Sequence, residues 1–302
     1  MLKSAPHSHR RQWNQGLKAN GMEVLHDTKI YGPAALERCA DDVAAQVLAN
    51  DWVNSEYKRL VLKAPAPAGF AVAGQFFNLE CPATEADRPF FRRPMSIYKA
   101  EPRNGILEFL YKVTGAGSRG LASLAPGETL RVLGPLGVGF TLDPAWRNIV
   151  VLGRGVGLAT LAPLAELAAE SNIGVTSILS ARSPAQVMSV DRFEAIGARI
   201  EIVLDSDGSS APVNVEALLR SLHDETRADA FFTCGSNRLM LLLQRLGQEL
   251  AIPGQVALEQ QMACGLGMCF CCVRKFRSGD ATVNRRVCWE GPAFDLQEAL
   301  SW

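Results

Sequence analysis

Five of the eight cysteines in this 302-residue chain lie in one segment near the C-terminus. Four of the five follow the spacing C-x4-C-x2-C-x15-C: Cys264, Cys269, Cys272 and Cys288. A C-x4-C-x2-C…C pattern is typical of plant-type [2Fe–2S] sites, in which thiolates bind the iron. Gly265 and Gly267 allow the loop to wrap tightly, and their N–H groups can donate to the sulfurs. The spacing therefore predicts an iron–sulfur cluster on these four cysteines.

Structural zinc is the main alternative for these cysteines. Zinc sites favour two cysteine pairs held apart by a longer spacer, whereas here three thiols belong to one loop. Cys271 is an additional thiol between two predicted ligands, and we expect its side chain to point away if Cys272 binds iron. Dense cysteines in a reducing compartment indicate metal binding rather than disulfides.

A second group of residues has the chemistry to bind a flavin nucleotide. Arg93, Pro94, Met95 and Ser96 lie on a predicted strand. An arginine can hold a diphosphate through two parallel hydrogen bonds, and a serine three residues later can reach a flavin ring. A solvated surface arginine is the plain alternative.

A strand and a glycine-rich turn follow this group. The strand carries Leu110, Tyr111 and Lys112, and the turn ends with Gly117 and Ser118. Glycines in such a turn let the backbone approach a phosphate closely. A simple turn between strands would have the same composition, so these residues indicate a flavin site only in combination with the group at 93–96.

A third group suits a dinucleotide. Gly153, Gly155 and Gly157 follow a predicted buried strand and open a helix, which is the context that binds dinucleotide phosphates. The pattern is G-x-G-x-G rather than G-x-G-x-x-G. Cys234 and Gly235 end the last predicted strand of the same region, at the edge of the sheet where ligands bind. A buried Cys234 that only packs in the core is the alternative.

Two patterns of apolar residues organise the chain around these groups. Alternating residues and Pro/Gly turns predict short antiparallel strands of a small barrel or sandwich over 43–50, 57–64, 75–79, 93–99, 106–114 and 128–133. Strands then alternate with helices from 148 to 248, which predicts a parallel sheet covered on both faces. The fold class is therefore a multidomain α/β plus β protein.

Four ranges follow from these patterns. We predict an N-terminal extension over 1–41, an antiparallel β-barrel flavin domain over 42–143, an α/β parallel-sheet nicotinamide domain over 144–252 and a small [2Fe–2S] module over 253–302. The composition, 48% apolar and 21% charged, is that of a globular protein with a sizeable core.

Charge and hydropathy exclude several classes of function. The formal net charge is zero, which argues against a general affinity for nucleic acid. Neither a secretory signal nor an apolar stretch long enough to span a membrane is visible, so we expect a cytoplasmic protein without a membrane span.

The order of these elements resembles the ferredoxin–NADP reductase superfamily. The cysteine segment, Met262-Ala-Cys-Gly-Leu-Gly-Met-Cys with Arg286-Val-Cys-Trp-Glu-Gly-Pro-Ala-Phe-Asp, is similar to the electron-transfer subunits of type B dihydroorotate dehydrogenase. The resemblance covers about residues 42–302. It implies FAD at the barrel, NAD(H) at the α/β domain and a [2Fe–2S] cluster at the cysteines.

The resemblance also implies a partner. In that family a catalytic subunit containing FMN oxidises dihydroorotate, a step of pyrimidine biosynthesis, and we expect a hetero-oligomer with such a subunit. The chain itself shows no set of catalytic residues for an organic substrate. The alternatives are the same relay in another dehydrogenase or reductase complex, and a non-enzymatic redox sensor or zinc-stabilised interaction protein.

Three departures from the family pattern bear on these expectations. Arg154 stands where the family usually has glycine, Ser118 replaces the usual threonine, and the N-terminal extension is unusual. We favour NAD over NADP from the resemblance alone, because Arg182, after a predicted strand, is equally suited to a 2′-phosphate and to the protein surface.

Overall fold

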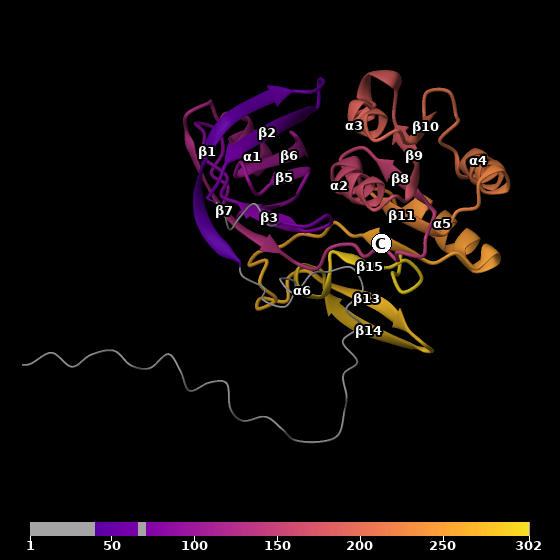
Figure 1. Cartoon of the computed structure of the whole chain (residues 1–302). Coiled ribbons are helices and arrows are strands. Elements are labelled where there is room, and N and C mark those ends of the chain that lie inside the picture. Colours follow the sequence, from indigo (N-terminus) through magenta and orange to yellow (C-terminus); the bar gives the residue numbers. More distant parts are fainter. Residues whose placement is uncertain (1–39, 66–70, 302) are drawn as a thin grey trace, which may run out of the picture.

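The computed structural model describes residues 40–65 and 71–301. The predicted extension, 1–41, lies outside the described residues except for its last two. A β-barrel, an α/β sheet and a cysteine-rich module follow one another along the chain (Figure 1). This is the fold class that the sequence predicts, and it is confirmed.

Seven strands and one short helix form the first part of the chain. They are β1 (Asp41–Trp52), β2 (Tyr57–Lys63), β3 (Phe76–Leu79), β4 (Arg93–Ser96), β5 (Lys99–Glu101), β6 (Ile106–Lys112), α1 (Ala116–Ala122) and β7 (Thr129–Leu136). All pairs are antiparallel, in the order β4-β3-β7-β1-β2-β6-β5. The two edge strands, β4 and β5, are consecutive in the chain. The segment that contains them therefore pairs with β3 at one edge and with β6 at the other, which curls the sheet into a barrel.

The alternation of side chains along β3 decides what each face of the barrel wall contacts. Phe77 and Leu79 belong to the core inside the barrel, where the rings of Phe77 and Phe109 meet edge to face at 5.8 Å. Phe76 belongs to a different core, shared with the α/β sheet and the cysteine module. Because successive strand residues face opposite sides, Asn78 points the same way as Phe76.

The second part is a six-stranded sheet with the order β10-β9-β8-β11-β12-β15, parallel except for β15. Helices α2 and α3 pack on one face, and α4 and α5 pack on the other. The elements are β8 (Asn148–Arg154), α2 (Gly157–Glu170), β9 (Gly174–Ala181), a short 3-10 turn (Pro184–Gln186), α3 (Val190–Ala195), β10 (Arg199–Leu204), α4 (Pro212–Glu225), β11 (Ala230–Cys234), α5 (Asn237–Leu250) and β12 (Gly254–Ala257).

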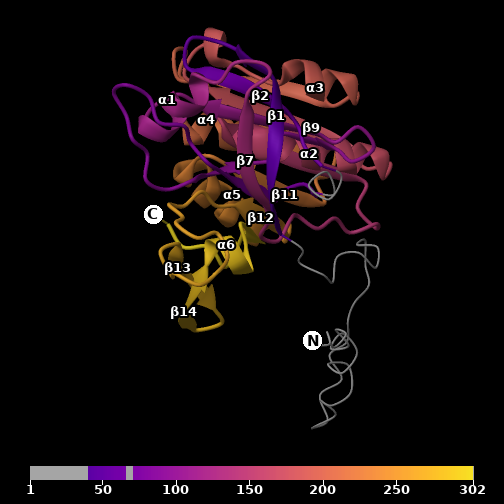
Figure 2. The same cartoon turned by 90° about the vertical axis from the view of Figure 1, so that its left-hand side faces the viewer.

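The cysteine module is built onto the end of this sheet. An irregular loop carries four cysteines, three of them predicted ligands. A hairpin and a one-turn helix follow: β13 (Val273–Ser278), β14 (Ala281–Arg286) and α6 (Val287–Glu290). The chain then returns to the large sheet as β15 (Ala293–Asp295). Both views place the hairpin and α6 at one end of the molecule, below the barrel and the sheet (Figures 1 and 2).

Two strands in the range predicted for the cysteine module, β12 and β15, belong to the six-stranded sheet. Neither strand was predicted from the sequence, because each has only three or four residues, too few to show a period of alternating apolar residues. Their position fixes the cysteine loop, which leaves the sheet edge directly after β12.

Candidate functional site

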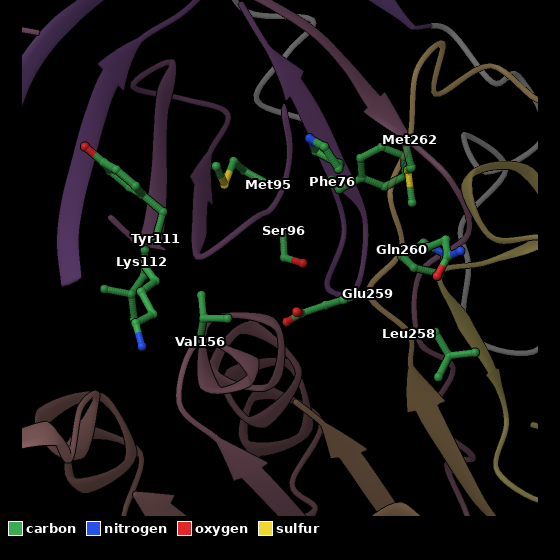
Figure 3. A pocket seen from close by; sticks show the side chains of 13 residues that line it. Phe76, Met95, Ser96, Tyr111, Lys112, Val156, Leu258, Glu259, Gln260 and Met262 are labelled. Carbon is green, nitrogen blue, oxygen red and sulfur yellow. The ribbon is translucent and has the colours of Figure 1, made fainter. Parts of the chain in front are cut away.

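A pocket lies between the barrel and the carboxyl edge of the parallel sheet (Figure 3). Its walls come from strands β3, β4 and β6 of the barrel, from the turn after β8, and from the segment after β12. The lining residues are Phe76, Pro94, Met95, Ser96, Leu110, Tyr111, Lys112, Val156, Leu258, Glu259, Gln260, Met262 and Pro292. A mostly apolar cleft with a few converging polar groups is typical of a cofactor site.

Six residues of the predicted flavin group line this pocket. Two of them, Ser96 and Tyr111, differ in which of their atoms face the cavity. Ser96 presents its hydroxyl to the cavity (Figure 3). The side chain of Tyr111 turns into the barrel core, and its hydroxyl donates to Asn50 Oδ1 at 2.9 Å. Only the backbone of Tyr111 is therefore available to a ligand.

Arg93 and Gly117 meet at a second place on the barrel. A Cβ atom on Gly117 would lie 2.6 Å from Arg93 Nε, so the guanidinium is held directly against that glycine. No carboxylate of the described residues forms an ion pair with Arg93. The hydroxyl of Ser118 accepts from the N–H groups of Thr114 and Gly115 and so orders the turn itself.

A second pocket adjoins the first at the carboxyl edge of the parallel sheet. Lys112, Val156 and Glu259 line both. The second pocket is polar and is also lined by Glu56, Tyr57, Arg154, Gly155, Ala181, Arg182, Gln186 and Gly235. Two cavities of different polarity therefore share one wall, which allows two ligands to touch.

The glycines after β8 have distinct roles. Gly155 has φ +55° and lines the second pocket, where a Cβ would lie 3.0 Å from the hydroxyl of Tyr57. Gly157 packs on β11: a Cβ there would lie 2.4 Å from the carbonyl oxygen of Cys234. Gly153 faces α2 instead. The structure thus brings Gly155 and Gly235 to the pocket, while Gly153 and Gly157 allow strand and helix to pack.

Cys234 is buried and belongs to the core beneath α2. Burial raises the pKa of its thiol. Cys234 lines neither pocket, and its position favours the alternative of a cysteine that packs in the core, while its role in cofactor binding stays a prediction.

Charged side chains surround the second pocket. Arg154 donates to both carboxylate oxygens of Asp205 and to Ser180 Oγ at 3.0 Å. Arg238 donates to the same carboxylate at 3.0 Å. Hydrogen bonds from Arg154, then from Ser210, hold the pKa of Asp205 well below its usual range, although desolvation opposes them. Arg154 thus lines the second pocket with its charge already paired to a carboxylate.

Lys112 and Arg182 are likewise paired, both with Glu56. Lys112 Nζ lies 2.7 Å from Glu56 Oε2, and Arg182 lies 3.2 Å from Glu56 Oε1. Arg182 is exposed on the rim of the second pocket. The Arg182–Glu56 pair joins the α/β domain to the barrel across the cavity, whereas the Lys112–Glu56 pair lies within the barrel.

The four predicted cluster ligands form two pairs. The thiols of Cys264 and Cys269 lie near each other, as do those of Cys272 and Cys288. The N–H group of Cys288 lies 3.4 Å from Cys272 Sγ. No group of three or more His, Cys, Asp or Glu side chains in residues 40–65 and 71–301 is arranged around a single metal ion.

Backbone N–H groups of the loop point at these sulfurs. Leu266 N lies 3.3 Å from Cys264 Sγ, and Gly267 N lies 3.2 Å from Cys288 Sγ. Gly265 and Gly267 have φ values of +71° and +75°, the conformation that the sequence analysis expected of them.

The two pairs differ in their environment. Although burial raises the pKa of Cys264, the N–H groups around it bring the value to about 7. Burial, together with the thiol of Cys272, raises the pKa of Cys288 to about 12. Soft donors with N–H groups directed at them, one pair buried and the other nearer the surface, suit a cluster with two irons, each bound by two thiolates.

Cys271 is oriented differently from its neighbour. It is exposed, and its sulfur lies 3.8 Å from the carbonyl oxygen of Gln261. Cys272 is buried beside Cys288. The choice of Cys272 as ligand stays a prediction, and this geometry favours it.

A short apolar bridge connects the first pocket with the cysteines. Phe76 and Met262 line the pocket and belong to the same hydrophobic cluster as Cys272 and Cys288. Figure 3 shows the two side chains together at one end of the cavity. Ligands at the pocket and at the cysteines would therefore be separated by closely packed side chains, without bulk water.

Sequence reasoning missed several residues of this site, above all Glu259. Its carboxylate points into the first pocket toward Ser96 (Figure 3). Glu259 is open to solvent through the cavity, yet the protein atoms crowded around it raise its pKa by desolvation. The apolar run 256–258 could have revealed a fifth parallel strand with Glu259 at its carboxyl end.

Comparisons with known proteins agree with this geometry. A family model described as the iron–sulfur cluster binding domain of dihydroorotate dehydrogenase B matches residues 259–299. The electron transfer subunit of dihydroorotate dehydrogenase B (NAD(+)) from Desulforamulus reducens is 32% identical over 250 residues, 83% of this chain and 95% of that protein. The chain belongs to the family of dihydroorotate dehydrogenase B electron transfer subunits.

Other members and a solved structure extend the comparison. The dihydroorotate dehydrogenase B electron transfer subunit from Bacillus caldolyticus is 33% identical and covers 75% of this chain and 86% of its own length. The structure of an NADH-dependent reduced ferredoxin–NADP oxidoreductase superposes with a TM-score of 0.72 at 25% identity, covering 84% of this chain and 88% of that one. This chain is accordingly an electron-transfer subunit of an oxidoreductase. None of its described helices is long and apolar enough to cross a membrane.

Proposed function

We propose that the chain passes electrons between NAD(H), FAD and a [2Fe–2S] cluster, and that it serves an FMN-containing catalytic subunit that oxidises dihydroorotate in the cytoplasm. The observation that carries the proposal is the series of three adjoining sites. A polar pocket shares a wall with an apolar pocket, which in turn adjoins the paired cysteines.

Each part of this series suits one cofactor. The first pocket suits the flavin ring, with Ser96 and the backbone of β6 as polar contacts and Arg93 and Gly117 for the diphosphate. The second pocket suits NAD(H), with Gly155 and Gly235 beside its phosphates. FAD supplies the exchange between two-electron and one-electron transfer.

The cysteines suit a [2Fe–2S] cluster better than zinc. Two thiolate pairs with loop N–H groups directed at the sulfurs provide two ligands for each of two irons. The protein keeps this site next to the flavin pocket through Phe76 and Met262, so a single electron has a short path between them.

The surface around the cysteine loop suits contact with a partner. Met268 is 77% exposed and Phe270 is 62% exposed, and both lie between cluster ligands in the sequence. The ring of Trp289 packs on Gly267 beside them and is also partly exposed. Exposed apolar side chains gathered in one loop are typical of an interaction site. We assign this surface to the catalytic subunit.

Isolation of the native complex tests the proposed function. The purified chain should contain flavin, iron and acid-labile sulfide, with about two irons per chain. It should copurify with an FMN protein that reduces the bound FAD when dihydroorotate is added. A colourless zinc protein, or a partner without dihydroorotate activity, would overturn the proposal.

The choice between NAD and NADP gives a first prediction. Substituting Asp205→Ala frees Arg154 and Arg238 from their shared carboxylate at the edge of the second pocket. Two unpaired guanidinium groups attract the additional phosphate of NADPH. We expect the preference for NADH over NADPH in reduction of the bound flavin to fall by about tenfold or more.

Stopped-flow measurement of kcat/KM for both nucleotides checks this result. Glu201→Gln is the control, because it removes one of the two carboxylates that pair with Arg199, on the surface of β10 away from the pocket. An unchanged preference in Asp205→Ala would show that the carboxylate does not act on the nucleotide.

A second prediction concerns Glu259. Its carboxylate lies where the two pockets meet and can stabilise the positive charge that the nicotinamide ring acquires on loss of hydride. Glu259→Gln keeps the shape and removes the charge, so we expect flavin reduction by NADH to slow by about tenfold while FAD binding is unchanged. Gln260→Ala, which alters the adjacent pocket residue, is the control and should leave the rate within about twofold.

A further inference from the structure

A fully buried amide stands beside the cysteine loop, and none of the residues that the structure describes forms a hydrogen bond with it. Asn78, on β3, is 1% exposed, and neither its Nδ2 nor its Oδ1 atom has a partner among residues 40–65 and 71–301. Buried amides are almost always hydrogen-bonded, because burial removes the water that would otherwise satisfy them. An amide that is orphaned in the described core therefore indicates a group that the described residues do not supply.

The position of Asn78 identifies what that group contacts. A Cβ atom on Gly265 would lie 2.4 Å from Asn78 Nδ2, so the amide lies against the backbone next to the predicted ligand Cys264. Asn78 also points to the same side of β3 as Phe76, whose core includes Cys272 and Cys288. The side chain thus leaves the barrel wall toward the cysteine loop.

We propose that Asn78 is a positioning residue for the iron–sulfur cluster: its NH2 group donates to a sulfur of the cluster or of a ligating thiolate and raises the reduction potential. This inference rests on the proposed function. Reduction adds negative charge to the cluster, so a donor to sulfur stabilises the reduced form more than the oxidised form. Loss of the donor should make the cluster harder to reduce.

The alternative occupant is an ordered water that satisfies the amide and has no bearing on the cluster. Gly265, which lies against the amide, also lies against the apolar side chain of Leu136: a Cβ atom on this glycine would be 2.9 Å from Leu136 Cδ1. A water usually needs two to four polar partners. A polarisable sulfur acceptor suits this position better.

The test uses Asn78→Leu and Asn78→Asp in the full chain. Both keep approximately the size of the side chain and remove the NH2 donor. We expect the ratio of reduced to oxidised cluster at a fixed potential to fall about tenfold, or about 59 mV for a one-electron couple. Potentiometric titration followed by electron paramagnetic resonance measures the cluster, and visible absorption measures the flavin, whose potential should not change.

Ser177→Ala is the matched control. Ser177 is also fully buried with an unpartnered hydroxyl, but it lies on β9 of the parallel sheet. Its removal should leave the cluster potential unchanged. Asn78→Ala, which removes the donor without adding charge or bulk, covers the case in which the other two replacements prevent cluster assembly.

The outcomes separate the inference from the proposed function. If the wild-type chain contains no iron–sulfur cluster, the proposed function is wrong. If the wild-type cluster is present and the Asn78 variants keep its potential, with or without a lower melting temperature, only the inference is wrong. A downward shift in the Asn78 variants that is absent in Ser177→Ala supports it.

Discussion

Replacing Cys272 by serine should remove the iron–sulfur cluster and leave FAD bound. Cys272 is 1% exposed and pairs with Cys288, so no solvent ligand can easily take its place. A serine oxygen is a poorer ligand than thiolate for the iron of such a cluster. We expect iron and acid-labile sulfide to fall at least about tenfold. Flavin content should stay near that of the wild type, because Cys272 does not line the first pocket.

Cys271→Ser is the matched control for this prediction. The two cysteines are adjacent in sequence, but Cys271 is exposed and directed at the carbonyl of Gln261. The control should keep both iron and flavin. If instead Cys271→Ser lost the iron and Cys272→Ser retained it, the ligand would be Cys271 and the loop would have to rearrange on cluster binding.

The cysteine site is the part that the sequence predicts best. The spacing of Cys264, Cys269 and Cys272 is local, and the glycines between them report the backbone conformation directly. Strand alternation and strand–helix alternation are also local signals, so the barrel and the parallel sheet could be predicted. Only Cys288 depends on a longer connection, and the hairpin β13–β14 provides it.

The parts that could not be predicted depend on contacts between distant segments. Glu259 has no motif of its own, and it becomes a pocket residue only because β12 joins the parallel sheet. Asn78 looks in sequence like any polar residue on a strand. Its proposed role depends on its position against Gly265, a residue of the cysteine loop that is distant in sequence and that the fold brings next to it.

A sequence motif also does not show which atoms of a residue face a ligand and which pack inside the protein. Tyr111 belongs to the predicted flavin group, yet its ring packs inside the barrel and its hydroxyl binds Asn50. The hydroxyl of Ser118 accepts from the turn's own N–H groups. A sequence pattern identifies the segment, whereas the direction of each side chain follows from packing in the whole fold.

Arg93 is the residue whose loss should weaken FAD binding most. Its guanidinium lies against Gly117, and no carboxylate among the described residues neutralises it. A charge-assisted hydrogen bond to a diphosphate contributes about 1.5–3 kcal/mol. Arg93→Ala should therefore lower the affinity for FAD by about 10- to 100-fold, and Arg93→Lys should recover part of it, because lysine keeps the charge without the planar fork.

The adjacent arginine provides the control. Arg92 already pairs with Asp42 at 2.9 Å and with Glu80 at 3.3 Å, so its charge is neutralised by the protein itself. Arg92→Ala should change FAD affinity by no more than about twofold, since partly exposed ion pairs contribute little. Calorimetric titration of the flavin-free chain with FAD measures both variants. An equal loss in both would mean that the arginines act through the stability of the barrel, and that the diphosphate is bound elsewhere.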